Sequence, residues 1–217
     1  YNLSPQALEE KLIQAQKSGR LPKVVVPVHL CGQSCDMESI YRLGQQYGFS
    51  IIEDASHAIG GSYQGHAIGC GQYSDITVFS FHPVKIVTTG EGGMAVTNRK
   101  ELADKMRRLR SHGITRNVDE MTQSPDGPWY YQQLELGFNY RMTDIQAALG
   151  CSQLKKLDRF IEQRNSIADI YHRALSAMEI TTPHVYPECR SAYHLYVVCL
   201  DHKRSAISHR QLFEQMR

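Results

Sequence analysis

A single lysine, Lys85, follows a run of β-branched and aromatic residues and is the first candidate for chemistry in this sequence. The run from Thr77 to Phe81 is typical of a strand, and Pro83 ends it because proline has no N–H to give to a sheet. At a strand exit with apolar walls behind it, a lysine can have its charged form disfavoured by loss of water. Such an amine can attack a carbonyl carbon and form a Schiff base. Most lysines are solvated surface residues, so this interpretation needs a second feature.

The second feature is a pair of acids, Glu53 and Asp54, at the end of another apolar strand. Ligands of open α/β sheets bind outside the carboxyl ends of the strands. A carboxylate there can pair with a protonated pyridine nitrogen and keep the ring electron-poor. His57 would be a neighbour of that ring, and the hydroxyl of Ser80 would contact a phosphate. We therefore predict that Asp54, His57, Ser80 and Lys85 form one site.

The composition narrows the class of protein. The 217 residues are 41% hydrophobic and 21% charged, as in ordinary globular proteins, and the net charge of +2 gives no reason to expect a nucleic-acid partner. No apolar run has the length of a membrane span, and no signal-peptide pattern opens the chain. The six cysteines are scattered, so we expect reduced thiols in the cytoplasm and no metal site. Because the chain starts at Tyr1 and stops at Arg217 inside a helical pattern, we expect it to be a fragment.

The elements around these residues can be predicted from their patterns. Residues 24–30 form a continuous apolar strand, in which we expect Pro27 to lie near the end or at a bulge. A helix follows, with Asp36 as its N-cap and Gly48 at its end. The next strand is the one that carries Asp54. This strand–helix–strand unit predicts a right-handed parallel crossover.

Two later helices have recognisable beginnings. Asn98 and Glu101 resemble a capping box, and Thr143 and Gln146 resemble another. The second box opens a long apolar periodicity that predicts a helical rod, with a possible break near Asp158.

Three further segments leave alternatives open. The glycine-rich residues 60–71 form either a flexible surface excursion or a loop that approaches a cofactor or a neighbouring subunit, and we weigh these equally. Residues 115–134 read as a long loop, in which the aromatic residues 129–131 either wall off a ligand or, the safer interpretation, pin the loop to its own protein. Residues 193–200 read as a strand of a second domain, followed by a helix from Ser208.

Several motifs in one order resemble a known family. Residues 53–60 (EDASHAIG), residues 80–85 (SFHPVK) and residues 90–93 (GEGG) resemble the DegT/DnrJ/EryC1/StrS sugar aminotransferases, and more broadly the fold-type I pyridoxal-phosphate enzymes. The resemblance implies an α/β fold with a mostly parallel sheet and pyridoxal 5′-phosphate as the cofactor. It also implies that residues 1–157 are the C-terminal part of a large cofactor-binding domain. Residues 158–217 would then be a connecting helix and the start of a small α+β domain.

The resemblance assigns roles by position. Lys85 would hold the cofactor as a Schiff base and carry a proton between carbon atoms, while Asp54 would bind the ring nitrogen. Ser80 would contact the phosphate, and His57 would either pack on the ring or bind its phenolic oxygen. Asn139 matches a residue that reaches the phosphate of the neighbouring subunit's cofactor, which implies a homodimer with shared sites. The alternative is that Asn139 only shapes a turn.

The same resemblance suggests a reaction. The dehydratase branch of the family has histidine in place of Lys85, so the lysine favours transamination. Residues 80–93 and 127–131 are most similar to the pseudaminic-acid branch, which implies L-glutamate and a UDP-linked 4-keto-6-deoxy-N-acetylhexosamine as substrates. A regulatory relative that binds the cofactor without turnover, or an inactive fragment, are the alternatives. His82 and Arg141 lie in the motifs, and their roles stay open.

Overall fold

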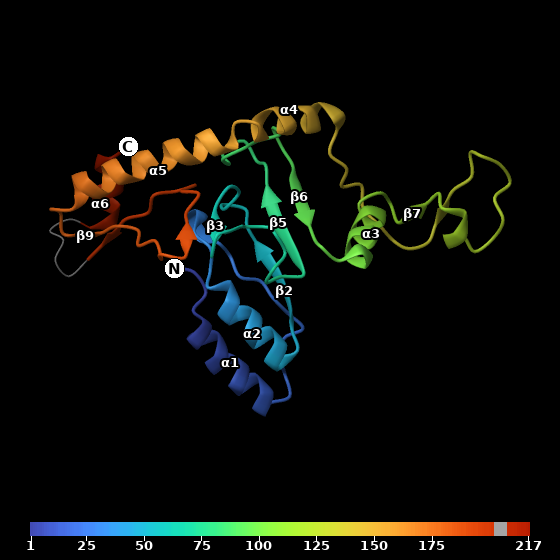
Figure 1. Cartoon of the computed structure of the whole chain (residues 1–217), viewed down its shortest axis with the longest axis horizontal. Helices are drawn as coiled ribbons and strands as arrows, with labels where there is room; N and C mark the ends of the chain where they lie inside the picture. Colours follow the sequence, from blue (N-terminus) through green and yellow to red (C-terminus); the bar gives the residue numbers. More distant parts are fainter. Residues whose placement is uncertain (202–207) are drawn as a thin grey trace.

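The computed structural model describes residues 1–201 and 208–217, and a four-stranded sheet lies at the centre of this part of the chain (Figure 1). The strand order is β1-β2-β5-β6, with bounds Val24–Val25, Ser50–Asp54, Ile76–Ser80 and Gly93–Val96. β1, β2 and β5 are parallel, and β6 is antiparallel to β5. The predicted α/β fold with a mostly parallel sheet is therefore confirmed.

The predicted strand at residues 24–30 is interrupted. β1 ends at Val25, and the buried Pro27 follows it. The chain returns to β2 at a single bridge between Val28 and Asp54, where the Asp54 N–H donates to the Pro27 carbonyl at 2.9 Å. The proline thus lies just beyond the strand's end, as expected, because it can accept a hydrogen bond there but cannot donate one.

Two N-terminal helices, α1 (Pro5–Lys17) and α2 (Met37–Tyr47), pack against each other beside the sheet (Figure 1). Asp36 caps α2 by accepting the Ser39 N–H, and Gly48 ends it in the left-handed region at φ 77°. Both predicted boundaries are confirmed. The buried side chains of this layer form one hydrophobic cluster, which includes Leu12, Met37, Ile40, Leu43, Phe49 and Ile51.

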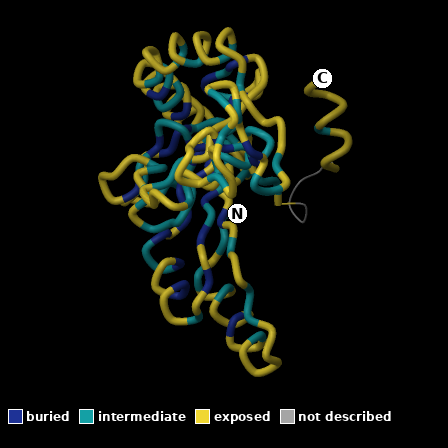
Figure 2. Tube along the Cα trace, turned by 90° about the vertical axis from the view of Figure 1, so that its right-hand side faces the viewer, coloured by how far each residue is buried: buried dark blue, intermediate teal, exposed yellow. Residues whose placement is uncertain are grey.

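The predicted rod consists of α4 (Asp144–Leu154) and α5 (Leu157–Leu175), with the break at Lys155–Lys156. The Thr143–Gln146 capping box is present. Most of the rod is exposed (Figure 2), but Ile161 of α5 is buried in a second cluster with Phe79, Phe81, Ile86 and Val87. This contact places α5 against the turn that carries Lys85. Among the described residues, no helix is both long and apolar enough to span a membrane.

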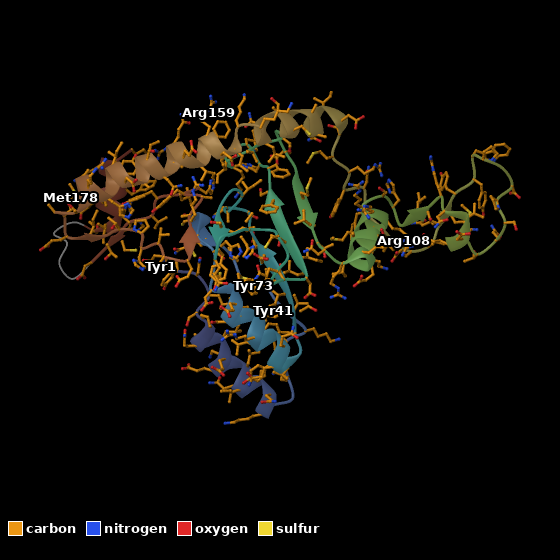
Figure 3. All side chains as sticks on the ribbon, in the orientation of Figure 1. Tyr1, Tyr41, Tyr73, Arg108, Arg159 and Met178 are labelled. Atoms are coloured by element: carbon orange, nitrogen blue, oxygen red, sulfur yellow. The ribbon has the colours of Figure 1, made fainter. Side chains whose placement is uncertain are left out.

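An arm projects from β6 (Figure 1) and contains α3 (Lys100–Leu109), the turn Val118–Glu120 and the antiparallel pair of β7 (Ile114–Thr115) and β8 (Gln132–Gln133). Arg108 (Figure 3) donates to Glu135 at 2.8 Å and to Glu120 at 3.1 Å, which ties the two sides of the arm together.

The predicted capping box at Asn98 is wrong. Arg99 occupies the N-cap position of α3 without a side-chain cap. Asn98 donates instead to the Cys70 carbonyl at 2.7 Å, and Arg99 binds Asp75 and Glu101. The side chains of Asn98 and Arg99 bond to residues distant in sequence, and therefore neither of them caps the helix.

The glycine-rich segment 60–71 forms a packed hairpin of β3 (Ser62–Tyr63) and β4 (His66–Ala67), rather than a loose excursion. A Cβ at Gly60 would lie 2.7 Å from a side-chain atom of Ile161. The glycine therefore permits a close approach to α5.

The predicted strand at residues 193–200 is wrong for its first six residues. Only β11 (Cys199–Leu200) forms, and it pairs with β9 (Ile180–Thr181). Further upstream, β10 (Cys189–Arg190) pairs with β3 instead. The backbone of residues 192–195 bonds to the short helical turn Leu30–Gly32, so it is not free to extend a strand. The helix predicted from Ser208 is present as α6 (His209–Gln215), and the domain division at residues 157/158 stays a prediction.

Candidate active site

The carboxyl ends of β2 and β5 bring three predicted residues together. Asp54 ends β2, Ser80 ends β5, and the two parallel strands lie side by side with Asp54 opposite Val78. The turns that follow carry His57 and Lys85. Apart from burial, the pKa of His57 responds to the charge of Lys85, which lowers it, and to that of Asp54, which raises it. Asp54, His57 and Lys85 therefore share one site at this edge of the sheet, and Ser80 lies on the adjacent strand end.

Asp54 is held by its backbone and leaves part of its carboxylate available. The carbonyl of Asp54 accepts the His29 N–H at 3.0 Å, and its Oδ1 accepts the Ser56 N–H at 3.0 Å. The Oδ2 atom has no hydrogen-bond partner among the described residues. This oxygen can accept a proton donor from a bound molecule.

Lys85 lies in a closed turn between β5 and β6. Its N–H donates to the His82 carbonyl at 2.9 Å, and the Phe81 carbonyl accepts the Thr89 N–H at 3.1 Å. Ile86 and Val87, which follow the lysine, are buried in the cluster beneath α5. The Nζ atom makes no hydrogen bond or ion pair within residues 1–201 and 208–217, so the amine is available for chemistry.

His57 is held as a neutral proton donor. Its Nδ1 accepts the Cys31 N–H at 3.3 Å, so the proton of the neutral ring is on Nε2. Burial lowers the pKa of His57, and the charge of Lys85 lowers it further. His194 covers part of the ring, with centroids 4.5 Å apart. Whether His57 packs on a bound ring or binds its phenolic oxygen stays a prediction.

Glu53, directly before Asp54, forms a buried network that we did not predict. It accepts the Thr77 hydroxyl at 3.0 Å, the Ser74 hydroxyl, and Nε2–H of His29 at 2.7 Å. The His29 Nδ1 accepts the Cys35 N–H at 3.1 Å, which fixes this tautomer. Burial alone would raise the pKa of Glu53, but these hydrogen bonds outweigh it and lower the pKa. Because neighbouring strand residues point to opposite faces, Glu53 supports the strand while Asp54 is left for the site.

We expect Glu53→Gln to lower the free energy of unfolding by about 3 kcal/mol near neutral pH. The amide N–H₂ of glutamine would face other hydrogen-bond donors, and the negative charge of the Glu53 carboxylate, which accepts their hydrogen bonds, would be lost. The folded-state pKa of Glu53 is below its ordinary value of 4.5, so this stabilisation is present above pH 4.5 and is lost as the pH falls through the folded-state pKa. Urea unfolding at several pH values would measure the difference between wild type and variant.

That difference should be constant around pH 7 and shrink in acid. The matched control is Glu101→Gln, because Glu101 pairs with Arg99 on the surface. A wild-type-like stability for Glu53→Gln at pH 7, or a difference that grows in acid, would contradict this account.

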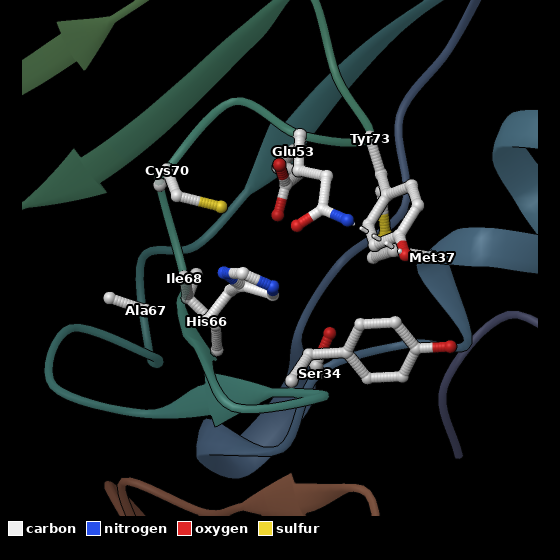
Figure 4. Close-up of a pocket in the computed structure, with 11 residues that line it drawn as sticks. Ser34, Met37, Glu53, His66, Ala67, Ile68, Cys70 and Tyr73 are labelled. Carbon is white, nitrogen blue, oxygen red and sulfur yellow. Dashed lines mark hydrogen bonds between the residues drawn. The ribbon is translucent and has the colours of Figure 1, made fainter.

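A small cavity borders Glu53, and Asp54 is not among the residues that line it (Figure 4). It has a volume of about 20 Å³ and is lined by Glu53, Tyr73, His66, Met37 and other residues. This volume suits a single water molecule and is too small for a cofactor. The chemistry is therefore expected at the open strand ends.

Asn139 does not join the group within this chain. It is exposed on the arm, where its backbone forms a bridge with Ser111, and the arm leads away from β5 (Figure 1). Its predicted contact with a neighbouring subunit's cofactor stays a prediction.

The aromatic residues of the arm divide between two roles. The Tyr130 hydroxyl accepts hydrogen bonds from Gln123 and Gln132, which tie parts of the loop to each other. Trp129 is 74% exposed and Tyr131 is 52% exposed, so these two rings are largely left uncovered.

Two curated proteins are similar to almost the whole chain. It is 40% identical over 196 residues to the spore coat polysaccharide biosynthesis protein SpsC of Bacillus subtilis, covering 90% of this chain and 50% of SpsC. It is 37% identical over 200 residues to the UDP-4-amino-4,6-dideoxy-N-acetyl-beta-L-altrosamine transaminase of Campylobacter jejuni serotype O:23/36, covering 92% of this chain and 50% of that protein.

A solved structure has the same fold. Helicobacter pylori PseC, an aminotransferase involved in the biosynthesis of pseudoaminic acid, matches with a TM-score of 0.81 and 33% identity over 93% of this chain and 50% of PseC. The chain thus spans about half the length of the relatives it matches. The sequence pattern of one family extends over residues 1–217, from end to end. The chain belongs to the DegT/DnrJ/EryC1/StrS aminotransferase family.

Proposed function

We propose that this chain is part of a longer pyridoxal-phosphate-dependent enzyme that transfers an amino group from L-glutamate to the C4 keto group of a UDP-linked 4-keto-6-deoxy-N-acetylhexosamine. The observation that carries the proposal is the grouping of Asp54, His57 and Lys85, which is unpaired among the described residues, at the carboxyl ends of β2 and β5. This is the place where open α/β sheets bind ligands.

The residues present fit the family's cofactor, pyridoxal phosphate. Oδ2 of Asp54, which has no partner in the described part of the chain, would accept the N–H of the pyridine ring, and Nζ of Lys85 would bind the aldehyde carbon. The Ser80 hydroxyl would contact the phosphate. When bound, the cofactor supplies an electron sink that stabilises negative charge on a substrate carbon.

Residues of this chain would transfer the proton, limit the access of water and donate a hydrogen bond. Nζ of Lys85 would take a proton from one substrate carbon and return it to another. Apolar residues behind the turn, Ile86 and Val87, limit the water around it. His57 is neutral, so its Nε2–H would donate a hydrogen bond without adding a positive charge beside Lys85.

The sugar is assigned from the relatives. The Campylobacter protein is named as a transaminase of a UDP-4-amino-4,6-dideoxy-N-acetyl-beta-L-altrosamine, PseC for the biosynthesis of pseudoaminic acid, and SpsC for a spore coat polysaccharide. The altrosamine and PseC matches favour the UDP-linked N-acetyl sugar.

We infer that the working enzyme is a homodimer with shared sites. Asn139 lies on the arm and away from the Lys85 of its own chain, and apolar side chains on the arm and on α4 are largely uncovered: Leu136 is 86% exposed, Tyr140 75% and Ile145 84%. A second copy that covered these residues would also bring Asn139 to a site. The six cysteines, all within the described residues, are free, which fits a cytoplasmic enzyme.

The function is tested with the complete protein reconstituted with pyridoxal phosphate. L-Glutamate is expected to convert the cofactor to its amino form, seen by absorbance, with one 2-oxoglutarate released per site. The UDP-linked 4-keto sugar should then restore the original spectrum, and a 4-keto sugar without the N-acetyl group should restore it more slowly. Binding of the cofactor without conversion by glutamate would instead identify a non-catalytic relative.

A further inference from the structure

His194, which the sequence pattern places in a strand, lies against the site. Its ring packs on His57 with centroids 4.5 Å apart and an angle of 42° between the planes. The two histidines lie far apart in the sequence. Their contact depends on the path of residues 191–195, which run between α5 and the turn Leu30–Gly32.

The backbone of Cys31 links His57 to the segment that carries His194. Its N–H donates to Nδ1 of His57 at 3.3 Å, and its carbonyl accepts the Leu195 N–H at 3.4 Å. Next to it, the Gly32 carbonyl accepts the Ala192 N–H at 2.9 Å. Cys31 has φ 62°, a left-handed conformation that costs energy for a residue with a side chain. Strained backbone of this kind is often found at functional sites.

The other side of the segment is held by α5. Arg164 donates from Nη1 to the Tyr193 carbonyl at 3.0 Å and to the His194 carbonyl at 3.4 Å. Gly32 has φ 112°, and a Cβ at this position would lie 2.7 Å from the Tyr193 backbone nitrogen. The backbone around His194 is therefore held between α5 and the Cys31 turn.

The properties of the His194 ring indicate that it packs against His57 and does not transfer a proton. Burial, followed by the charges of His57, Lys85 and Arg164, lowers the pKa of His194 to about 4. The ring is therefore neutral near pH 7. Its Nδ1 is buried without a hydrogen-bond partner among the described residues. Contact with the ring of His57 is thus the clearest interaction of the His194 side chain.

We propose that His194 is a positioning residue that holds the ring of His57 so that its Nε2–H faces the space beside Lys85. The single hydrogen bond at Nδ1 of His57 is long, and it would allow the ring to tilt about the N–H···N axis. Packing by His194 restricts that motion. This inference rests on the proposed function for its effect on rate, but the orientation of His57 can be measured without the cofactor.

The test compares His194→Ala with His194→Phe in the complete protein. In cofactor-free protein, NMR of ¹⁵N-labelled histidine rings should show a single Nε2–H tautomer for His57 in the wild type. In the alanine variant the ring of His57 should tilt away from the Cys31 N–H and show a mixture of tautomers, and kcat/KM for amino transfer should fall by about ten- to a hundredfold. Phenylalanine keeps a flat ring at the position and should restore both properties to near the wild-type values.

The matched control is His172→Ala. His172 lies on α5, bonds to the Ala168 and Pro183 carbonyls and packs against Tyr196, so it belongs to the same region without contacting His57. Its replacement should leave the His57 signals unchanged. If His194→Ala does not fold, His194→Gln removes the ring with less loss of volume and should give the same mixture.

The proposal would be overturned if His194→Ala left the tautomer of His57 unchanged. It would also be overturned if His194→Phe lowered kcat/KM and mixed the tautomers as much as His194→Ala does. A mixture of His57 tautomers already in the wild type would do the same. If the wild type converts no glutamate, the proposed function fails, while the NMR comparison still decides whether His194 positions His57.

Discussion

Lys85→Ala is expected to lower the rate of amino transfer by about 10⁴-fold, because the substitution removes both the nucleophile and the group that moves the proton. The fold should be unaffected, since Nζ makes no hydrogen bond or ion pair in the described part of the chain. Steady-state assays with L-glutamate and the UDP-linked 4-keto sugar would measure the loss. Lys100→Ala is the matched control, because Lys100 is an exposed lysine that pairs with Asp104 on α3.

Reduction with borohydride tests the identity of the attachment lysine directly. In the complete wild-type protein, reduction should fix the cofactor to the peptide that contains Lys85. A label on Lys23, Lys100 or any other lysine would show that the assignment is wrong.

Mixing Lys85→Ala with Asn139→Ala tests whether the two subunits share their sites. If each site takes Lys85 from one chain and Asn139 from the other, a mixed dimer has one site with both native residues, and activity should return. The subunits must be shown to exchange, for example with two affinity tags. Exchange without recovery of activity would mean that Asn139 serves its own chain or no site at all.

Asp54→Asn is expected to lower turnover by about a thousandfold, which corresponds to about 4 kcal/mol of transition-state stabilisation. Asparagine can still accept the Ser56 N–H through Oδ1, and the backbone bonds to Pro27 and His29 do not involve the side chain. The loss should therefore come from the missing charge beside the pyridine nitrogen. Turnover, the absorbance of the bound cofactor and the midpoint of urea unfolding would be measured together.

Asp75→Asn is the matched control for this prediction. Asp75 accepts the Ile51 N–H at 2.9 Å and pairs with Arg99, at the end of β5 remote from Ser80. Its replacement should affect stability and spare turnover. Near-normal turnover of Asp54→Asn would show that another group holds the ring.

Local sequence patterns predicted the start of a helix correctly where the capping residues are close in sequence. The capping box of Thr143 and Gln146 and the N-cap Asp36 formed as expected, because each bond closes within one helical turn. The capping box at Asn98 failed although its residue types were suitable. The Cys70 carbonyl, distant in sequence, took the side chain that would have capped α3.

The reading of residues 193–200 failed for a related reason. A short, mostly apolar run fits a strand equally well as a segment that packs against another part of the chain. The hydrogen bonds of Ala192 and Leu195 to the turn at Gly32 and Cys31 decided between them. The same turn brought His194 to His57, a contact for which no spacing in the sequence gives a signal.

The sequence alone determined which residues stand at strand ends, because an apolar run followed by Asp54, or by Ser80 and Lys85, is a local property, and parallel strands bring their carboxyl ends to one edge. Only the tertiary structure decided which of those side chains are buried in the protein and which are left available to a ligand. Glu53 joins a buried network with His29 because the loop that follows β1 covers one face of β2. Asp54 beside it keeps one carboxylate oxygen without a partner within residues 1–201 and 208–217. Long-range packing also set His194 against His57 and left Asn139 on the arm, since these placements depend on contacts between distant segments that no local pattern encodes.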